Sequence, residues 1–114
     1  NVYLGIKYVG EGIAEYAEAK YAGTPIKHND SWVETSRKMY EKGKITLLNL
    51  SKVYSVGLNL VAPIIDQYGE EGIRYLIRNL PKGEELADLA AYQQNALNAL
   101  SEYAPRFECH SPEK

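Results

Sequence analysis

The chain has 114 residues, of which 45% are hydrophobic and 25% are charged, and its formal net charge at pH 7 is −2. This length and composition are typical of one globular domain and exclude a disordered or low-complexity chain. The slight negative charge excludes a general electrostatic attraction to nucleic acid or acidic membranes, although a local basic patch is compatible with it. A single cysteine excludes an internal disulfide framework.

The first predicted helix covers about residues 2–22. Its apolar residues recur at the spacing of one helical face: Ile6, Val9, Ile13 and Tyr16. Three glycines lower its helix propensity by about 1 kcal/mol each relative to alanine, so we expect another helix to approach them closely. They are Gly5, Gly10 and Gly12. The Gly23-Thr24-Pro25 segment ends this helix.

A polar connector over residues 24–30 precedes the second predicted helix. Ser31 and Glu34 have the spacing of a capping box, which predicts that the helix begins there. Trp32, Ser36 and Met39 share one face of it, and Gly43 is expected to end or kink it.

The third predicted helix, over residues 45–65, is apolar except for one narrow polar stripe. The stripe consists of Thr46, Asn49, Lys52, Ser55 and Asn59. Such a pattern predicts the long central helix of a bundle. The segment is long enough to span a bilayer, but a central Lys52 would cost about 2.5–3.5 kcal/mol there, so no transmembrane span is predicted. Pro63 is expected to kink or end the helix and to move Ala62 out of the helical region.

Two further helices follow a turn at residues 67–69. The first covers about residues 70–80, and its apolar face is predicted to hold Ile73, Leu76, Ile77 and Leu80. The second covers about residues 84–103 and is apolar on one face except for Gln93. Because no segment alternates with a period of two, the sequence predicts an all-α, single-domain, antiparallel bundle of four to five helices. Residues 1–104 form the domain and residues 105–114 a polar C-terminal tail.

Motifs for chemistry are absent from the sequence. There is no H-x-x-x-H, C-x-x-C, Glu-x-x-His or G-x-S-x-G pattern, and no phosphate-binding glycine loop. Cys109 and His110 are neighbours, but both lie in the predicted tail, without a scaffold. The sequence therefore predicts no catalytic residue, metal ligand or cofactor, and it favours a non-enzymatic protein.

The apolar central helix favours a binding protein that holds an apolar or amphipathic small molecule in the bundle core. In this interpretation Asn49, Lys52 and Tyr54 orient a polar head group. The whole predicted ligand-binding set is Asn49, Lys52, Tyr54, Val56, Leu60, Ile64, Ile73, Ile77, Gln93 and Leu97, with Leu48 and Leu89 completing the apolar wall. The buried stripe also needs hydrogen-bond partners, which are the ligand head group, water or the amides of the last helix. Those amides belong to Gln93, Gln94, Asn95 and Asn98.

Tyrosine supplies the alternative interpretation, since the chain has ten tyrosines but only one phenylalanine and one tryptophan. Tyrosine has an apolar ring and a polar tip, which suit interfaces. A Tyr-rich surface favours a protein-interaction partner: an inhibitor, an immunity-type protein or an assembly subunit. Rings that converge on an internal cavity would favour the ligand, whereas a contiguous exposed patch would favour the partner.

The ends of the sequence give weaker expectations. A start at Asn1 rather than methionine favours a processed or trimmed chain, with a weak preference for export. Cys109, in the predicted tail, would allow a disulfide-linked homodimer in an oxidising compartment. Asn29 and Asn49 lie in N-glycosylation patterns, of which the second falls inside a predicted helix.

Overall fold

A computed structural model of the chain describes residues 2–42 and 50–110. In this part of the chain the elements are α1 (Val2–Ala22), α2 (Trp32–Lys42), α3 (Leu50–Arg78), the 3-10 helix η2 (Gly83–Ala87) and α4 (Leu89–His110). The prediction of an all-α bundle of four to five helices is confirmed. None of the described helices combines the length and the hydropathy needed to cross a bilayer.

The helix boundaries differ from the expected ones at both ends of α4. The segment after the Pro81 break forms η2, and α4 begins only after Asp88, whose side-chain Oδ1 accepts a hydrogen bond from the Ala91 N–H at 3.2 Å. An aspartate in this position satisfies a backbone donor that the first helical turn leaves free. At its other end α4 continues to His110, past the expected end at Tyr103. The division of the chain at residue 104 stays a prediction.

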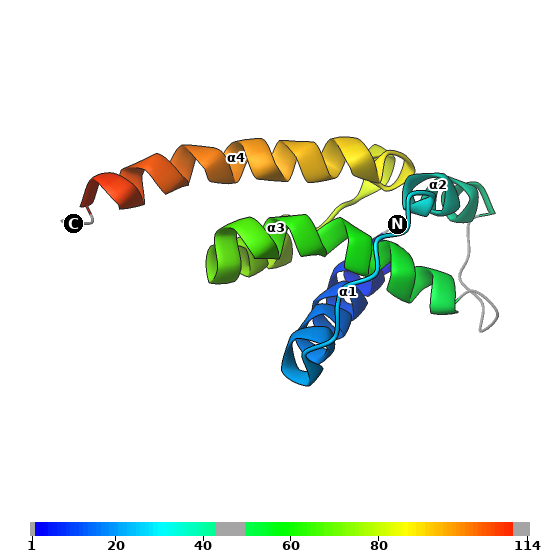
Figure 1. Cartoon of the computed structure of the whole chain (residues 1–114). Coiled ribbons are helices and arrows are strands. Elements are labelled where there is room, and N and C mark those ends of the chain that lie inside the picture. Colours follow the sequence, from blue (N-terminus) through cyan, green and yellow to red (C-terminus); the bar gives the residue numbers. More distant parts are fainter. Residues whose placement is uncertain (1, 43–49, 111–114) are drawn as a thin grey trace.

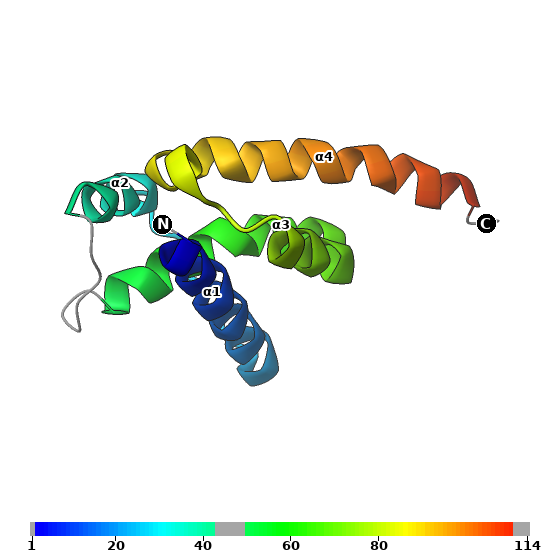
Figure 2. The same ribbon diagram turned by 180° about the vertical axis from the view of Figure 1, so that it is seen from behind.

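The helices form three layers, with α3 in the middle (Figures 1 and 2). Helix α1 crosses one side of α3 obliquely, and α4 lies on the other side. Helix α4 runs in the same direction as the beginning of α3, and its C-terminal end projects beyond the other helices. The bundle is therefore not a simple up-and-down array.

Helix α3 is made of two limbs that meet at Gly69. The backbone of Gly69 has φ 57° and ψ −130°, a conformation that is open almost only to glycine, and the chain changes direction there. We call residues 50–68 the first limb and residues 70–78 the second limb. The turn expected at residues 67–69 is thus confirmed. In contrast, Pro63 lies inside the first limb, so the expectation that Ala62 leaves the helical region is wrong.

Helices α1 and α3 cross at a pair of glycines. A methyl group on Gly57 would overlap the Tyr8 carbonyl oxygen and would lie 3.1 Å from the Gly12 Cα atom. The absence of both side chains lets the two backbones touch, which explains why α1 tolerates glycine inside a helix. The predicted close approach is confirmed at Gly12. It is wrong at Gly10, where nothing lies within 4 Å of an added Cβ atom.

The start of α2 does not use the expected capping box. The Ser31 backbone N–H and hydroxyl both donate to Asn29 Oδ1, at 3.0 and 2.8 Å, while Glu34 pairs with Arg37 at 3.1 Å. The Asn29 side chain therefore stabilises the turn that leads from the connector into α2, by accepting a hydrogen bond from the backbone two residues ahead. Below it Trp32, Ser36 and Met39 are buried, as predicted.

Candidate functional site

Gln93, the polar residue on the otherwise apolar face predicted for α4, bonds the backbone of α3. The Gln93 Nε2 atom donates to the carbonyl oxygens of Asn59 and Leu60, at 3.0 and 2.8 Å. The Asn59 carbonyl would accept a hydrogen bond from residue 63 in an ordinary helix, but Pro63 has no N–H. Gln93 thus satisfies a carbonyl group that the proline leaves free. Gln93 thus bonds the backbone of α3 and not the polar side chains of the stripe, so the expected pairing of the α4 amides with those side chains is wrong for Gln93.

Asn59, the buried member of the stripe, ties α3 to the connector. Its Oδ1 atom accepts from the Asn29 backbone N–H at 3.0 Å, and its Nδ2 atom donates to the Ser55 carbonyl oxygen at 2.8 Å. The Asn29 side chain in turn donates to the Ser55 hydroxyl at 3.3 Å. These bonds hold the extended connector against the first limb.

The predicted apolar wall lies in the packed core. Val56, Leu60 and Ile64 are fully buried, and none of them lines any of the surface hollows described below. Ile73 and Leu97 pack against this core from its edge. The structure therefore uses these residues to join α3 to its neighbours.

Ile77 does not share the buried face of the second limb. It is 58% exposed, whereas the adjacent Leu76 is fully buried, so the prediction that both lie on one core-facing side is wrong. Consecutive residues of a helix point about 100° apart, and here Leu76 faces the core. Ile77 instead lines a surface cleft.

The residues predicted to hold a polar head group are separated in the structure. Lys52 is exposed and, with Lys38 and Lys42, borders a small hollow of about 150 Å³. Tyr54 lines a different hollow beside the connector. Asn49 lies outside the described residues. The binding roles of all ten predicted residues stay predictions, but Lys52, Tyr54 and Ile77 line three different hollows.

An amphipathic cleft lies where the second limb, the segment before η2 and α4 meet. We call it the Tyr75–Tyr92 cleft; its volume is about 380 Å³. It is lined by Tyr75, Ile77, Arg78, Asn79, Leu80, Pro81, Lys82, Glu85, Tyr92 and Asn95. Clefts of this size are typical of small-molecule sites.

The charges of this cleft favour an anion. Arg78 and Lys82 are exposed, and neither forms an ion pair with any described residue. The one carboxylate of the lining belongs to Glu85, whose Oε1 accepts from the Lys82 backbone N–H at 3.1 Å. This bond caps the start of η2 and holds the carboxylate against the backbone. The side chains of Arg78 and Lys82 therefore remain available to bind an anionic ligand.

The two tyrosines of the cleft differ in their freedom to bind. The Tyr92 hydroxyl donates to the Asn79 carbonyl oxygen at 2.5 Å, which fixes its ring against the connecting segment. Burial raises the pKa of Tyr92, and the neighbouring Tyr75 and Glu85 raise it further, so this phenol stays protonated. Tyr75 is half-buried, and its hydroxyl has no hydrogen-bond partner among the described residues. It is therefore able to bond a ligand.

Sequence reasoning missed most of the cleft, although it included Ile77. The only sequence signal was the break at residues 81–83 between two amphipathic helices, which brings Arg78 and Lys82 to one edge. Among the side chains that the structure describes, no three of His, Cys, Asp or Glu converge to hold a metal ion. Comparison with known proteins gives no match: no family model, no curated protein and no solved structure matches this chain.

Proposed function

We propose that this protein is a non-enzymatic binding protein that holds an amphipathic small anion in the Tyr75–Tyr92 cleft. The proposal keeps the ligand class expected from the sequence and moves the site from the bundle core to its surface. The observation that supports it most is that apolar side chains, including the exposed Ile77, line the same cleft as two cations that have no carboxylate partner among the described residues.

The apolar and the cationic side chains of the cleft would contact different parts of the ligand. The rings of Tyr75 and Tyr92 and the side chain of Ile77 contact the apolar body of the ligand, and removing this surface from water supplies most of the affinity. Arg78 and Lys82 then receive the anionic group at the open side, where Arg78 can bond a carboxylate through two N–H groups.

Naphthoate and its neutral analogue naphthamide test this function, because they share an aromatic body and differ in charge. In a calorimetric titration we expect naphthoate to bind more tightly than naphthamide. Arg78→Gln should weaken naphthoate by about threefold to tenfold and leave naphthamide unchanged, as expected for a partly exposed ion pair. Ile77→Ala should weaken both probes, since it removes apolar contact area.

Arg74→Gln is the matched control. Arg74 lies one turn before Arg78 on the same limb, but it is engaged by Glu70 and Glu71 at 3.2 and 2.8 Å. Its loss should leave naphthoate binding unchanged. Equal affinities for the two probes, or an equal effect of the two arginine variants, would contradict the proposed site. Native mass spectrometry of the purified chain shows in parallel whether it carries a small molecule.

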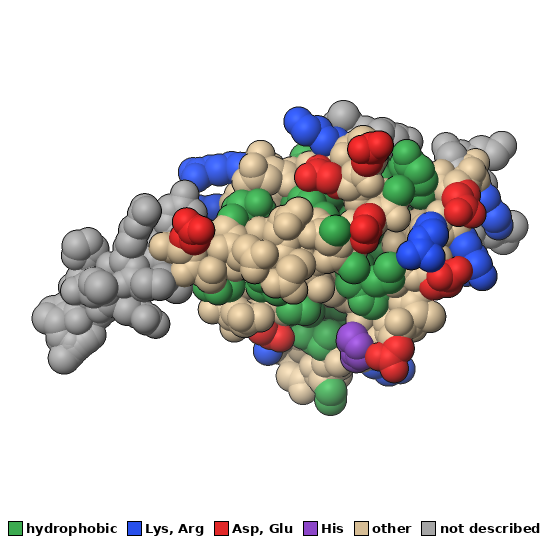
Figure 3. Space-filling view, turned by 90° about the horizontal axis from the view of Figure 1, so that it is seen from above, with side chains coloured by type: hydrophobic (Ala, Val, Ile, Leu, Met, Phe, Trp, Pro, Cys, Tyr) green, Lys and Arg blue, Asp and Glu red, His purple; other side chains and the backbone are tan. Residues whose placement is uncertain are grey.

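A protein partner remains the second candidate, on the evidence of Tyr21. This side chain is 96% exposed at the end of α1, and Ile6 and Tyr40 are also exposed, at 48% and 38%. Exposed tyrosines are common in binding hot spots. On the face shown in Figure 3, however, the hydrophobic side chains form several separate patches rather than one continuous patch. A pull-down with Tyr21→Ser as the comparison variant tests this candidate.

A further inference from the structure

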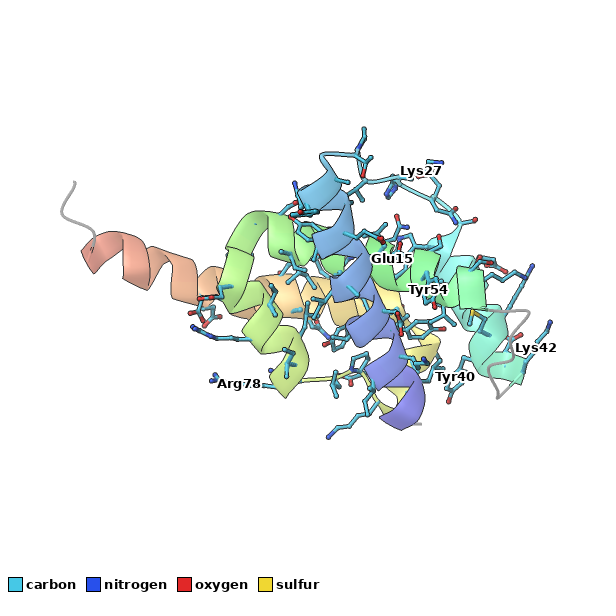
Figure 4. The ribbon with its side chains drawn as sticks, turned by 90° about the horizontal axis from the view of Figure 1, so that it is seen from below. Glu15, Lys27, Tyr40, Lys42, Tyr54 and Arg78 are labelled. Carbon is cyan, nitrogen blue, oxygen red and sulfur yellow. The ribbon has the colours of Figure 1, made fainter. Side chains whose placement is uncertain are left out.

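A second hollow, separate from the Tyr75–Tyr92 cleft, lies between α1, the connector and the first limb of α3. We call it the connector hollow; its volume is about 480 Å³. It is lined by Glu15, Lys27, His28, Asn29, Asp30, Ser51, Tyr54, Ser55, Leu58 and Asn59. Figure 4 shows Glu15, Lys27 and Tyr54 on one side of the molecule and Arg78, from the cleft, on the other.

One part of the lining is a fixed polar frame. Asn29, Ser55 and Asn59 bond one another across the junction of the connector with α3, as described above. His28 Nε2 lies 2.9 Å from Asp30 Oδ1, so these two side chains satisfy each other on the connector. The frame holds the walls of the hollow in place without a ligand.

The other part of the lining consists of polar groups that have no partner among the described residues. Glu15 on α1 is half-buried, and Lys27 on the connector is exposed; neither forms an ion pair or a side-chain hydrogen bond with a described residue. The hydroxyl groups of Ser51 and Tyr54, both on α3, likewise have no partner among those residues. Three different elements thus bring an unpaired carboxylate, an unpaired ammonium and two free hydroxyls to one hollow.

We propose that the connector hollow binds a zwitterion, a small molecule that carries one ammonium group and one carboxylate group. Opposite charges that stand apart on two walls attract a ligand whose own charges are separated, because each end then meets a charge of the other sign. A simple amine would be repelled by Lys27, and a simple carboxylate by Glu15. The Tyr54 ring offers an apolar surface for the chain between the two ends, and its hydroxyl and that of Ser51 accept from the ammonium.

The test compares ligands that differ only in charge. Titrations followed by two-dimensional NMR use the zwitterions γ-aminobutyrate and ε-aminohexanoate, together with hexylamine and hexanoate. We expect at least one zwitterion to cause saturable shifts that centre on Glu15, Lys27 and Tyr54. The amine and the carboxylate should bind at least about tenfold more weakly, a difference of about 1.4 kcal/mol.

Variants then assign each end of the ligand. Glu15→Gln and Lys27→Gln should each weaken the zwitterion by about threefold to tenfold, as expected for partly exposed ion pairs. The double variant Glu15→Lys with Lys27→Glu should restore binding in the reverse orientation, which a merely structural role would not do. Glu18→Gln and Lys38→Gln remove the same charges elsewhere and serve as controls, and circular dichroism checks that each variant folds.

Three results would overturn the proposal: no binding of either zwitterion, equally tight binding of hexylamine or hexanoate, or equal losses in the control variants. Because Arg78 and Ile77 lie outside this hollow, their variants should leave zwitterion binding unchanged. A failure here is therefore distinguishable from a failure of the Tyr75–Tyr92 cleft.

Discussion

Replacing Gln93 with methionine removes the amide that bonds the Asn59 and Leu60 carbonyl oxygens but keeps a side chain of similar length. Pro63 supplies no N–H for the Asn59 carbonyl, so this group would lose its donor inside the interface between α3 and α4. An unsatisfied, partly buried carbonyl costs about 1–3 kcal/mol. We expect Gln93→Met to lower the free energy of unfolding by that amount.

A double-mutant cycle with Pro63→Ala tests the cause of this loss. Alanine at position 63 restores a backbone N–H that can bond the Asn59 carbonyl within the helix. In that background Gln93→Met should cost less, by about 1 kcal/mol or more, because the carbonyl no longer depends on the amide. Urea unfolding of the four proteins, followed by circular dichroism and Trp32 fluorescence, measures each value. An equal cost of Gln93→Met in both backgrounds would refute this reasoning.

Three further predictions concern stability. Gly57→Ala should lower the free energy of unfolding by about 1–3 kcal/mol, because the added methyl group meets backbone atoms of α1. The control Gly10→Ala should raise the free energy of unfolding by up to about 1 kcal/mol, because nothing lies near the added methyl group. Urea unfolding compares the two variants. Gly69→Ala should lower the free energy of unfolding by about 1–3 kcal/mol. Gly69→Asn should be as destabilising, since a ψ of −130° lies outside the left-handed helical region that asparagine tolerates. Thermal unfolding of the two variants measures both losses. Burial raises the pKa of Tyr8 from 10.0 to about 12, and burial followed by the hydrogen bond and the charge of Asp66 raises the pKa of Tyr16 to about 12. The folded state holds these protons more tightly than the unfolded state, so their contribution to stability is complete below pH 10 and is lost as the pH rises through 12. Absorbance titration of folded and urea-unfolded protein should show the difference, and Tyr8→Phe should reduce it.

The helices were predictable because their signals are local. The spacing of apolar residues in α1 and the sequence Gln67-Tyr68-Gly69 each act within a few residues, and the structure has the helix and the turn that they predict. The predicted apolar face of α1 is wrong at Ile6, which is 48% exposed. Pro63 was misjudged for the opposite reason. Its effect on the helix depends on Gln93, which lies 30 positions later in the sequence and donates to the Asn59 carbonyl that Pro63 leaves without a partner.

The candidate sites were harder to predict, because they depend on which side of each helix meets a neighbour. Lys52 and Tyr54 are two positions apart on α3 and therefore line different hollows. Ile77 fits the periodicity of a core residue as well as Leu76 does, yet in the second limb Leu76 is fully buried and Ile77 is exposed. Periodicity identifies an apolar face only to within about one residue, and that residue decides whether a side chain packs or lines a cleft.

The tyrosines show how the structure separates packing from binding where composition does not. Three of them join elements through their hydroxyl groups: Tyr8 donates to Met39 Sδ at 3.7 Å, Tyr16 to Asp66 at 2.5 Å and Tyr92 to Asn79 at 2.5 Å. A phenol suits such boundaries because its ring is buried while its tip still finds a partner. Tyr54 and Tyr75 are also half-buried, but their hydroxyls have no partner in the described part of the chain, and each lines one of the two proposed sites. A hydroxyl group at the edge of the core that has no protein partner can still form a hydrogen bond with water or with a ligand. Tyr54 and Tyr75, rather than the tyrosine content as a whole, therefore indicate where we expect this protein to bind a ligand.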